Sequence, residues 1–209
     1  MKNFAITAMG RSGTRFLAES MNISETWTVK HEAGRRHDMT RPRKVIQARF
    51  NHDHYGEVNG YLRFIIDNLA VEKRGIILRD PAELYLSITT WHSQPKRQSV
   101  LKKKWKGDFI EVTKAIPYLL TLAESGRYFV IDFHRMVSDR EYLKGIFAHF
   151  GITDIRVTKE MIDTRINKTP DEVRRTTWSD FNPGVKDAML RLSGNYQKRV
   201  DKIFGGGGV

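Results

Sequence analysis

The feature that most constrains the fold is the segment Phe4–Leu17, where an unbroken apolar run leads through a loop of small and basic residues into a helical pattern. A buried parallel strand that delivers its carboxyl end to a helix N-terminus has this order. At such a junction the free N–H groups of the first helical turn and the positive end of the helix dipole converge on one point. The segment therefore predicts an anion site suited to a phosphate, to which Arg11 and Arg15 add positive charge.

The loop departs from the standard P-loop, which requires G-x-x-x-x-G-K followed by Ser or Thr. With Gly13 aligned on the second glycine of that motif, Ala8 stands at the first, and Thr14 and Arg15 stand where Lys and Ser/Thr belong. A nucleoside-triphosphate hydrolase or kinase is therefore disfavoured, whereas a cradle for a different phosphate ester remains open. For this segment alone, an ordinary strand-to-helix turn with solvated arginines is the alternative.

Length and composition indicate a globular protein. With 209 residues, 40% of them hydrophobic, we expect one domain over residues 1–204 and a flexible Gly-rich tail over 205–209. No apolar run approaches the roughly 20 residues of a membrane span, and the N-terminal segment is too soon interrupted to be a secretory signal. The chain has no cysteine, which excludes disulfides, thiolate metal sites and a cysteine nucleophile. A cytoplasmic location is the default expectation.

The net charge of +12 predicts anionic partners. Basic stretches occur at Lys30–Arg49, Lys96–Lys106 and Arg165–Arg175. The lysines around Trp105 interleave an aromatic residue with positive charge, as many nucleic-acid surfaces do. Such a run is more often a solvated face, so we favour a charged nucleotide and an acidic acceptor over nucleic acid.

Apolar, β-rich segments alternate with helical patterns, which predicts the α/β class: a mostly parallel sheet with helices on both faces, in three layers. The continuous apolar runs among them suit strands that are covered on both faces. The expected strands are Phe4–Met9, Trp27–His31, Val45–Phe50, Gly75–Leu78 and Tyr128–Phe133.

Helical periodicity predicts apolar faces over Val58–Leu69, Phe109–Ala123 and Val185–Ile203. Pro117 is expected to kink or split the second of these helices, and Gly194 is a candidate break in the third. Asn182–Pro183 caps the start of the third.

A further helix is predicted from its boundary signals. Ser138–Glu141 has the pattern of a capping box, which would open a helix over Tyr142–Phe150 that Gly151 ends.

The segment Gly75–Ser87 repeats the strand-to-helix order. Asp80 and Pro81 suit the N-cap and the first helical position. Arg79 stands at the carboxyl end of the strand, where ligands bind in open α/β sheets, and Ser87 lies two turns into the helix. A guanidinium fork and a hydroxyl can clamp one phosphate, although a salt-bridged arginine and an exposed serine are the alternative for this segment alone.

Together the two segments resemble the sulfotransferases that use 3′-phosphoadenosine 5′-phosphosulfate (PAPS). In that family an early strand–loop–helix with an SGT core binds the 5′-phosphosulfate, and a later strand ending in Arg, with Ser eight residues on, binds the 3′-phosphate. The matching residues are Arg11, Ser12, Gly13, Thr14 and Arg15 for the first segment and Arg79 and Ser87 for the second.

The resemblance spans Phe4 to about Phe204 and implies a P-loop NTPase-like sulfotransferase architecture. Only the two phosphate segments carry specific motifs. The stretch Val130–Gly151 is similar to the family's later strand–turn–helix, but Phe133–Met136 departs from its frequent Glu-Asp-Leu core.

The resemblance also implies the chemistry. Sulfuryl transfer depends mainly on positioning and charge stabilisation, as phosphoryl transfer does. Arg11 stands where the family has the Lys or Arg that stabilises charge on the leaving phosphate, and the backbone N–H groups of Ser12 through Arg15 would hold the 5′-phosphate. The family typically uses no metal, and none is expected here.

A general base must take the acceptor's proton. Glu32 and His31 follow the second expected strand, and family members use a Glu or a His from that region. Since adjacent residues of an extended segment point opposite ways, we expect one of them to enter the site, and we favour Glu32 over His31. A surface histidine and a Glu paired with a nearby arginine are the alternative. His52, His54 and His92 are further candidates, and the histidines show no metal-ligand spacing.

A late basic loop often closes the nucleotide site in this family. Arg165–Pro170 is the counterpart here, with Asn167 and Lys168 as candidate contacts, and Trp178 is a candidate for stacking on a base. The acceptor, a small molecule or a glycan, and the oligomeric state are not determined by the sequence. Two other functions remain open: a nucleotide or sugar kinase with a degenerate P-loop, and a basic, non-catalytic module that binds nucleic acid.

Overall fold

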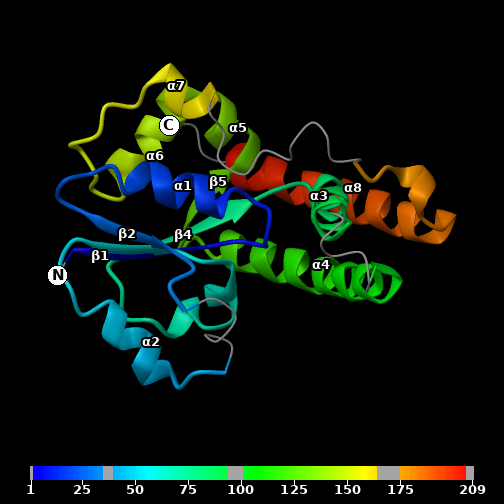
Figure 1. Ribbon diagram of the computed structural model, residues 1–209, viewed down its shortest axis with the longest axis horizontal. Helices are drawn as coiled ribbons and strands as arrows, with labels where there is room; N and C mark the ends of the chain where they lie inside the picture. The colour runs from blue at the N-terminus through cyan, green and yellow to red at the C-terminus, as the bar shows by residue number, and fades with distance from the viewer. Residues whose placement is uncertain (1, 35–39, 94–100, 164–174, 206–209) are drawn as a thin grey trace. The chain divides into compact units, whose positions relative to one another are not determined.

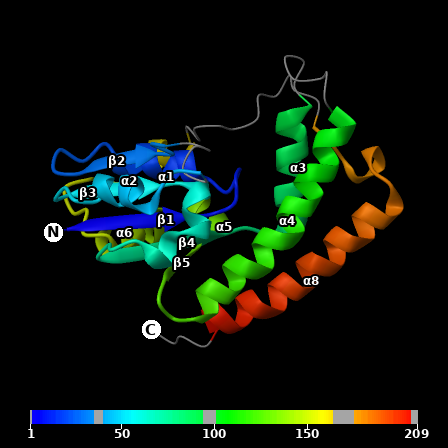
Figure 2. The same ribbon diagram turned by 90° about the horizontal axis from the view of Figure 1, so that it is seen from below.

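The computed structural model describes residues 2–34, 40–93, 101–163 and 175–205, with the backbone alone at 101–104. The chain forms two compact units (Figures 1 and 2). The α/β unit comprises Met1–Leu78 and Gly126–Asn167, and the helical unit comprises Arg79–Ser125 and Lys168–Val209. The single domain predicted over residues 1–204 stays a prediction.

A parallel five-stranded sheet forms the middle of the α/β unit, in the order β2-β3-β1-β4-β5. The central strand β1 is buried along its whole length, as its unbroken apolar run predicts. Because every pair is parallel, all carboxyl ends meet at one edge of the sheet. The strands are β1 (Asn3–Thr7), β2 (Thr28–His31), β3 (Tyr55–Val58), β4 (Lys73–Leu78) and β5 (Phe129–Asp132).

Helices cover both faces of this sheet, which confirms the predicted three-layer α/β class (Figure 1). The side chains of Asn3 and Thr7 point away from those of Phe4 and Ile6, and they bond to the chain on the α2 side. One face carries α1 (Thr14–Met21), α5 (Phe133–Ser138), α6 (Arg140–His149) and α7 (Lys159–Asp163), and the other carries α2 (Arg43–Arg49) and the 3₁₀ turns η2 (Gly60–Phe64) and η3 (Ile66–Asn68).

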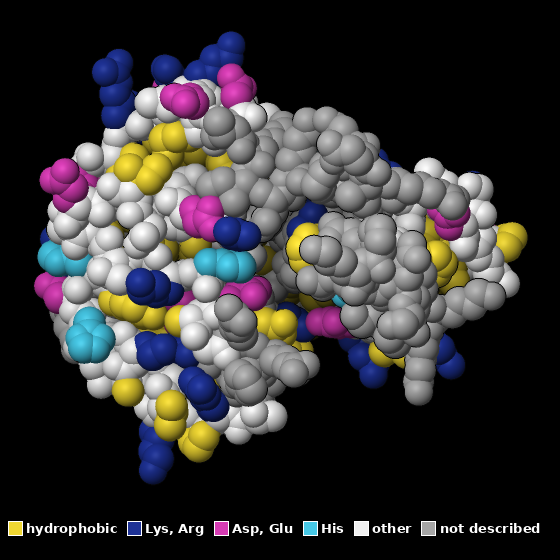
Figure 3. All heavy atoms as spheres, viewed as in Figure 1, with side chains coloured by type: hydrophobic (Ala, Val, Ile, Leu, Met, Phe, Trp, Pro, Cys, Tyr) yellow, Lys and Arg dark blue, Asp and Glu magenta, His cyan; other side chains and the backbone are white. Residues whose placement is uncertain are grey.

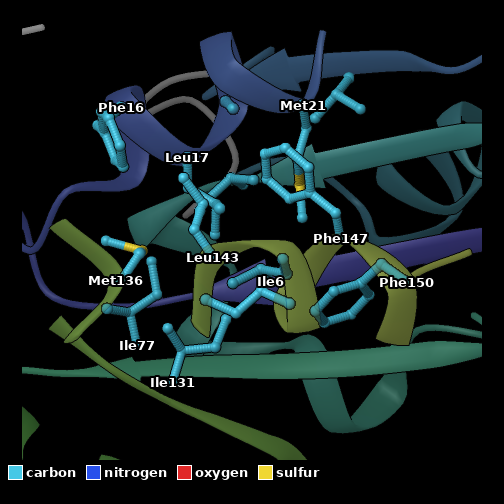
Figure 4. Close-up of a cluster of buried hydrophobic side chains, with 14 of the residues drawn as sticks. Ile6, Phe16, Leu17, Met21, Ile77, Ile131, Met136, Leu143, Phe147 and Phe150 are labelled. Carbon is cyan, nitrogen blue, oxygen red and sulfur yellow. The ribbon is translucent and has the colours of Figure 1, made fainter. Parts of the chain in front are cut away.

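The larger core lies between the sheet and the α1–α6 layer (Figure 4). Each fully buried Leu, Ile or Phe there contributes about 1.5–3 kcal/mol of burial free energy. Gly56 on β3 is essential to this packing, because a Cβ at that position would lie 2.1 Å from the ring of Phe4. Side chains from three strands and two helices meet there, among them Ile6, Leu17, Ile77, Ile131, Leu143 and Phe147.

One predicted strand is wrong. The segment Val45–Phe50 lies in and beside helix α2, with Ile46 and Phe50 fully buried four residues apart and Val45 44% exposed. That spacing is helical, and it outweighs the β-branched residues that indicated a strand. The missing strand is β3, which ends at Val58, so the helix predicted over Val58–Leu69 is replaced by the end of a strand and two 3₁₀ turns.

The helical unit packs α3 (Pro81–His92), α4 (Leu101–Glu124) and α8 (Pro183–Gly205) against one another (Figure 2). Neither helix is split: α4 continues through Pro117, and α8 continues through Gly194. Packing between the helices compensates for the backbone bond that a proline removes. Asn182 accepts a bond from the N–H of Gly184, which confirms the predicted start of α8.

The predicted capping box is displaced by one residue. Ser138 ends α5, and Asp139 caps α6 by accepting the N–H of Tyr142 at 3.0 Å. The helix then ends before Gly151, whose φ of 82° is the left-handed turn that was expected there.

Gly205 is the last residue of α8, and residues 206–209 of the predicted tail lie outside the described residues. Among the described helices, none combines the length and the apolar character needed to span a bilayer.

Candidate active site

The loop from Ala8 to Gly13 joins β1 to α1 at the carboxyl edge of the sheet, as the sequence predicts. Two left-handed residues turn the chain, Arg11 with φ 67° and Gly13 with φ 78°. The N–H of Ser12 bonds to the carbonyl of Met9 at 3.3 Å, and the first helical bond runs from the N–H of Leu17 to the carbonyl of Gly13. The N–H groups of the first turn of α1 have no carbonyl one turn back to bond, so they can serve an anion.

Gly13 is required for two reasons. Its positive φ disfavours any residue with a Cβ, and a Cβ there would lie 2.7 Å from the Cε methyl of Met136 and 3.1 Å from the ring of Phe133. Both neighbours come from α5. The start of α1 is therefore held against α5 at van der Waals distance.

The two loop arginines differ in their surroundings. Burial lowers the pKa of the Arg11 guanidinium, which stays charged at neutral pH. The side chain of Arg15 is 51% exposed and forms an ion pair with Glu19, one turn along α1. The positive charge that the sequence predicts for Arg15 at this site stays a prediction, and its backbone N–H belongs to the first turn.

His31 and Glu32 stand at the end of β2, on the same edge. The N–H of Glu32 bonds to the carbonyl of Val58 at 3.2 Å, but Glu32 itself has a φ of 47°. This left-handed turn replaces the extended backbone that would send the two side chains to opposite faces. The carboxylate Oε1 of Glu32 consequently lies 3.8 Å from Nε2 of His31, so the expectation of opposite directions is wrong.

His31 is joined to the loop through α1. Its Nε2 lies 3.1 Å from the hydroxyl of Thr14, a hydrogen-bond distance. Burial lowers the pKa of the imidazole below 6.5, Arg15 lowers it further, and Glu19 opposes the shift. At pH 7 His31 is therefore neutral, the form that can accept a proton.

Gly60, at the start of η2, lies beside both the β1–α1 loop and Glu32. A Cβ built on Gly60 would lie 3.2 Å from the carbonyl oxygen of Ala8, and 3.7 Å from both Glu32 Oε1 and the N–H of Gly10. The β1–α1 loop, the end of β2 and the turn after β3 thus meet at one place. Our sequence reasoning missed this turn because it assigned the segment to a helix, although Asn-Gly is a strong turn signal.

The second phosphate segment begins in β4 and enters the helical unit at Arg79. Asp80 accepts the N–H groups of Ala82 and Glu83, at 2.9 and 3.0 Å, and Pro81 follows it, which confirms the predicted cap of α3. Arg79 comes directly after β4, is 16% exposed, and has its Nε 3.8 Å from Glu83 Oε2. Ser87 is half-buried, two turns into α3.

Of the other candidate residues, the structure describes three histidines and Trp178. His52 and His54 precede β3 at the amino edge of the sheet, and His92 Nδ1 lies 2.7 Å from Asp108 in the helical unit. Trp178 stacks on Tyr85. Asn167 and Lys168 lie outside the described residues. The described residues contain no group of three or more His, Asp or Glu side chains placed to hold a metal ion.

The fold defined by this sheet, its strand order and its flanking helices is that of the sulfotransferases. A crystal structure of a sulfotransferase from Alicyclobacillus acidocaldarius aligns with 97% of this chain and 95% of its own, with a TM-score of 0.61 and 14% identity. The mouse sulfotransferase SULT7A1, complexed with PAP, aligns with 94% of this chain and 85% of its own, with a TM-score of 0.59 and 14% identity. No protein-family model and no curated protein matches the sequence. The likeness confirms the fold that the resemblance of the two phosphate segments implies.

Proposed function

We propose that this protein is a PAPS-dependent sulfotransferase that acts on a hydroxyl or amine of a small-molecule or glycan acceptor. The observation that carries the proposal is the meeting of the β1–α1 loop with His31 and Glu32 at the carboxyl edge of the sheet. An anion cradle then lies beside two candidate bases. The PAP in the mouse structure supports the same class of donor here.

The proposal assigns residues to the 5′-phosphosulfate and to the 3′-phosphate of the donor. The N–H groups of the first turn of α1, together with the Thr14 hydroxyl, bind the 5′-phosphosulfate, and Arg11 stabilises the charge that develops on the leaving phosphate. Following the family resemblance, Arg79 and Ser87 bind the 3′-phosphate, and Asn167 and Lys168 contact the nucleotide from the late loop.

The reaction moves an SO₃ group. A bond forms between the acceptor oxygen or nitrogen and sulfur, the bond between sulfur and the bridging oxygen of the donor breaks, and the electron pair leaves with the 5′-phosphate of PAP. The acceptor's proton goes to Glu32, which we favour, or to His31. Positioning and charge stabilisation supply the rate enhancement, and the proposal assigns no role to a metal.

Charge fits an anionic donor and an acidic acceptor better than a nucleic-acid surface. The chain carries a net charge of +12. On the face of the α/β unit seen in Figure 3, the Lys and Arg side chains of the described residues are scattered among neutral and apolar ones and form no continuous stripe. Nucleic-acid binding usually concentrates such charge on one face.

The proposal keeps the cytoplasmic location predicted from the sequence.

The test is calorimetric titration with PAP and with adenosine 5′-phosphate. We expect saturable PAP binding, weaker binding of the nucleotide that lacks the 3′-phosphate, and loss of affinity in Arg11→Ala and Arg79→Ala. Arg140→Ala is the matched control, because Arg140 is exposed and its ion pair within the described part of the chain is with the neighbouring Glu141. Transfer of radiolabelled sulfate from PAPS to a panel of phenols, glycans and amines then tests the reaction.

Other outcomes would favour other functions. Magnesium-dependent turnover of ATP without PAP binding would indicate a kinase. Steeply salt-dependent binding of duplex nucleic acid that PAP does not displace would indicate a nucleic-acid module.

A further inference from the structure

A fully buried carboxylate lies on β3, on the α2 side of the sheet. Glu57 is 0% exposed and its two oxygens accept bonds from three side chains. Arg49 of α2 places Nε 3.1 Å from Oε2 and Nη2 3.2 Å from Oε1. The Tyr55 hydroxyl donates to Oε2 at 3.3 Å, and the amide of Asn59 donates to Oε1 at 2.7 Å. A buried charge is tolerated only with such partners.

Asn59, which follows the last residue of β3, belongs to the same hydrogen-bond network. It is also 0% exposed, and its backbone N–H bonds to the carbonyl of Ile6 at 2.9 Å, while its own carbonyl accepts the Thr7 hydroxyl at 3.1 Å. Its side-chain oxygen accepts the N–H of Tyr61 at 2.8 Å. Because Glu57 accepts from the amide nitrogen, it fixes which side of the Asn59 amide faces η2.

The residue that follows Asn59 is Gly60, which lies against the candidate site. A Cβ built on Gly60 would lie 3.2 Å from the Ala8 carbonyl oxygen and 3.7 Å from both the Gly10 nitrogen and Glu32 Oε1, so Gly60 lies beside all three. On the other side of Asn59, the carbonyl of Val58 accepts the backbone N–H of Glu32. The end of β3 thus lies beside the β1–α1 loop and bonds to the backbone of the favoured base.

We propose that Asn59 is a positioning residue that holds Glu32 and the β1–α1 loop in a fixed relation, with Glu57 as its anchor. This inference rests on the proposed sulfotransferase function. It assigns Asn59 no contact with the donor or acceptor. A general base works only within hydrogen-bond reach of the proton it takes, so a small displacement of Gly60 would slow transfer.

A purely structural role is the competing account, because Glu57 and Arg49 also attach α2 to β3. The two accounts are separated by reversing the Glu57–Asn59 bond. Asn59→Asp keeps the oxygen that caps η2 but loses the donor and sets two carboxylates against each other. The double variant Glu57→Gln, Asn59→Asp restores one donor, one acceptor and one negative charge between positions 57 and 59, with the bond running the opposite way. Arg49 loses the oxygen that accepts from Nη2 but keeps the one beside Nε.

Asn3→Asp supplies the matched control. Asn3 is 5% exposed on the same face of the sheet, at its amino edge, and it donates to the carbonyl of Phe50 and accepts the N–H of Glu72. It therefore makes the same kind of bonds without touching the candidate site. We expect Asn3→Asp to lower the melting temperature and to leave the release of PAP from PAPS unchanged per folded molecule.

For Asn59→Asp we expect a fall of tenfold or more in kcat, measured as PAP release with acceptor present. The Kd of PAP should stay within threefold, because Gly13 and the start of α1 are held by α5. The double variant should recover kcat to within threefold of the wild type. Unchanged kcat in Asn59→Asp, or no recovery in the double variant, would overturn the inference.

A second readout needs no donor. Hydrogen exchange of the unliganded protein should show faster exchange at the Ser12 and Glu32 amides, which bond to the carbonyls of Met9 and Val58, in Asn59→Asp, and no such change in Asn3→Asp. Unchanged exchange at both amides would overturn the inference. If the wild-type protein binds no PAP, and Asn59→Asp still speeds exchange at the two amides, the proposed function is wrong and the positioning role of Asn59 remains.

Discussion

The hydroxyl of Thr14, in the first turn of α1, lies 3.1 Å from Nε2 of His31 at the end of β2. A hydroxyl has one proton to donate and two lone pairs that accept. In the tautomer whose Nε2 carries no proton, His31 and a phosphate bound at the start of α1 would compete for that one proton. Under the proposed function, donor binding then changes the hydrogen bonding of His31.

The Thr14 hydroxyl is tested by Thr14→Val, which keeps the shape of this buried side chain and removes its polar atom. Loss of a hydrogen bond to a charged phosphate costs about 1.5–3 kcal/mol, so PAP affinity should fall tenfold or more. Thr14→Ser, which keeps the hydroxyl, should bind PAP within a few-fold of the wild type. Calorimetric titration measures the PAP affinities. Equal affinities of the Val and Ser variants would show that the Thr14 hydroxyl does not bind the donor.

The base is tested by comparing Glu32→Gln with His31→Asn. A general base contributes a factor of about 10²–10⁴, so we expect Glu32→Gln to lose transfer by that factor while PAP affinity is retained. His31→Asn should lose less. The comparison uses single-turnover rates with saturating PAPS. If His31→Asn shows the larger loss and Glu32→Gln is nearly normal, the base is His31.

Much of this edge of the sheet could be predicted from short-range signals. The apolar runs that became β1 and β4, the Gly13 turn and the Asp80–Pro81 cap each depend on residues next to one another. Local propensity and capping therefore identified them. The α/β class followed from the alternation of these segments with helices.

Strand β3 and the turn at Glu32 could not be predicted, because they depend on contacts between residues far apart in the sequence. Strand β3 carries the charged Glu57 at a fully buried position, and bonds from Arg49, Tyr55 and Asn59 make that burial tolerable. A single sequence does not show such pairing, so the strand was missed. The left-handed turn at Glu32, which brings it back to His31, is likewise set by its bond to Val58.

The close packing of α1 on α5 is tested by Gly13→Ala. Gly126 has a similar φ, 71° against 78°, but a Cβ there meets nothing within 4 Å. Gly126→Ala should therefore cost only the backbone strain, about 1–2 kcal/mol of unfolding free energy. Gly13→Ala adds the clash with Met136 and should cost about 1–3 kcal/mol more. Urea denaturation measures both, and equal costs would contradict the packing seen here.

The pKa of His31 is lowered first by burial and is then adjusted by an ion pair on the neighbouring helix. Arg15 lowers the pKa of the imidazole and Glu19 raises it, in addition to the lowering by burial. Because the folded-state pKa lies below 6.5, the unfolded chain binds more protons in this range. The contribution of neutral His31 to stability is therefore full above about pH 6.5 and is lost as the pH falls through the folded-state value.

The pKa of His31 is measured by following its imidazole resonances in an NMR titration, with the other histidines as internal references. Arg15→Gln should move the midpoint up and Glu19→Gln should move it down, because each removes one opposing charge. Both shifts should shrink in high salt, since Arg15 and Glu19 are exposed. Unfolding free energies should follow the same order: between pH 5 and 7, Glu19→Gln should lose more stability on acidification than Arg15→Gln. Midpoints that do not move would show that the α1 ion pair has no influence on the pKa of His31, and midpoints that move in the same direction would contradict the opposing effects of Arg15 and Glu19.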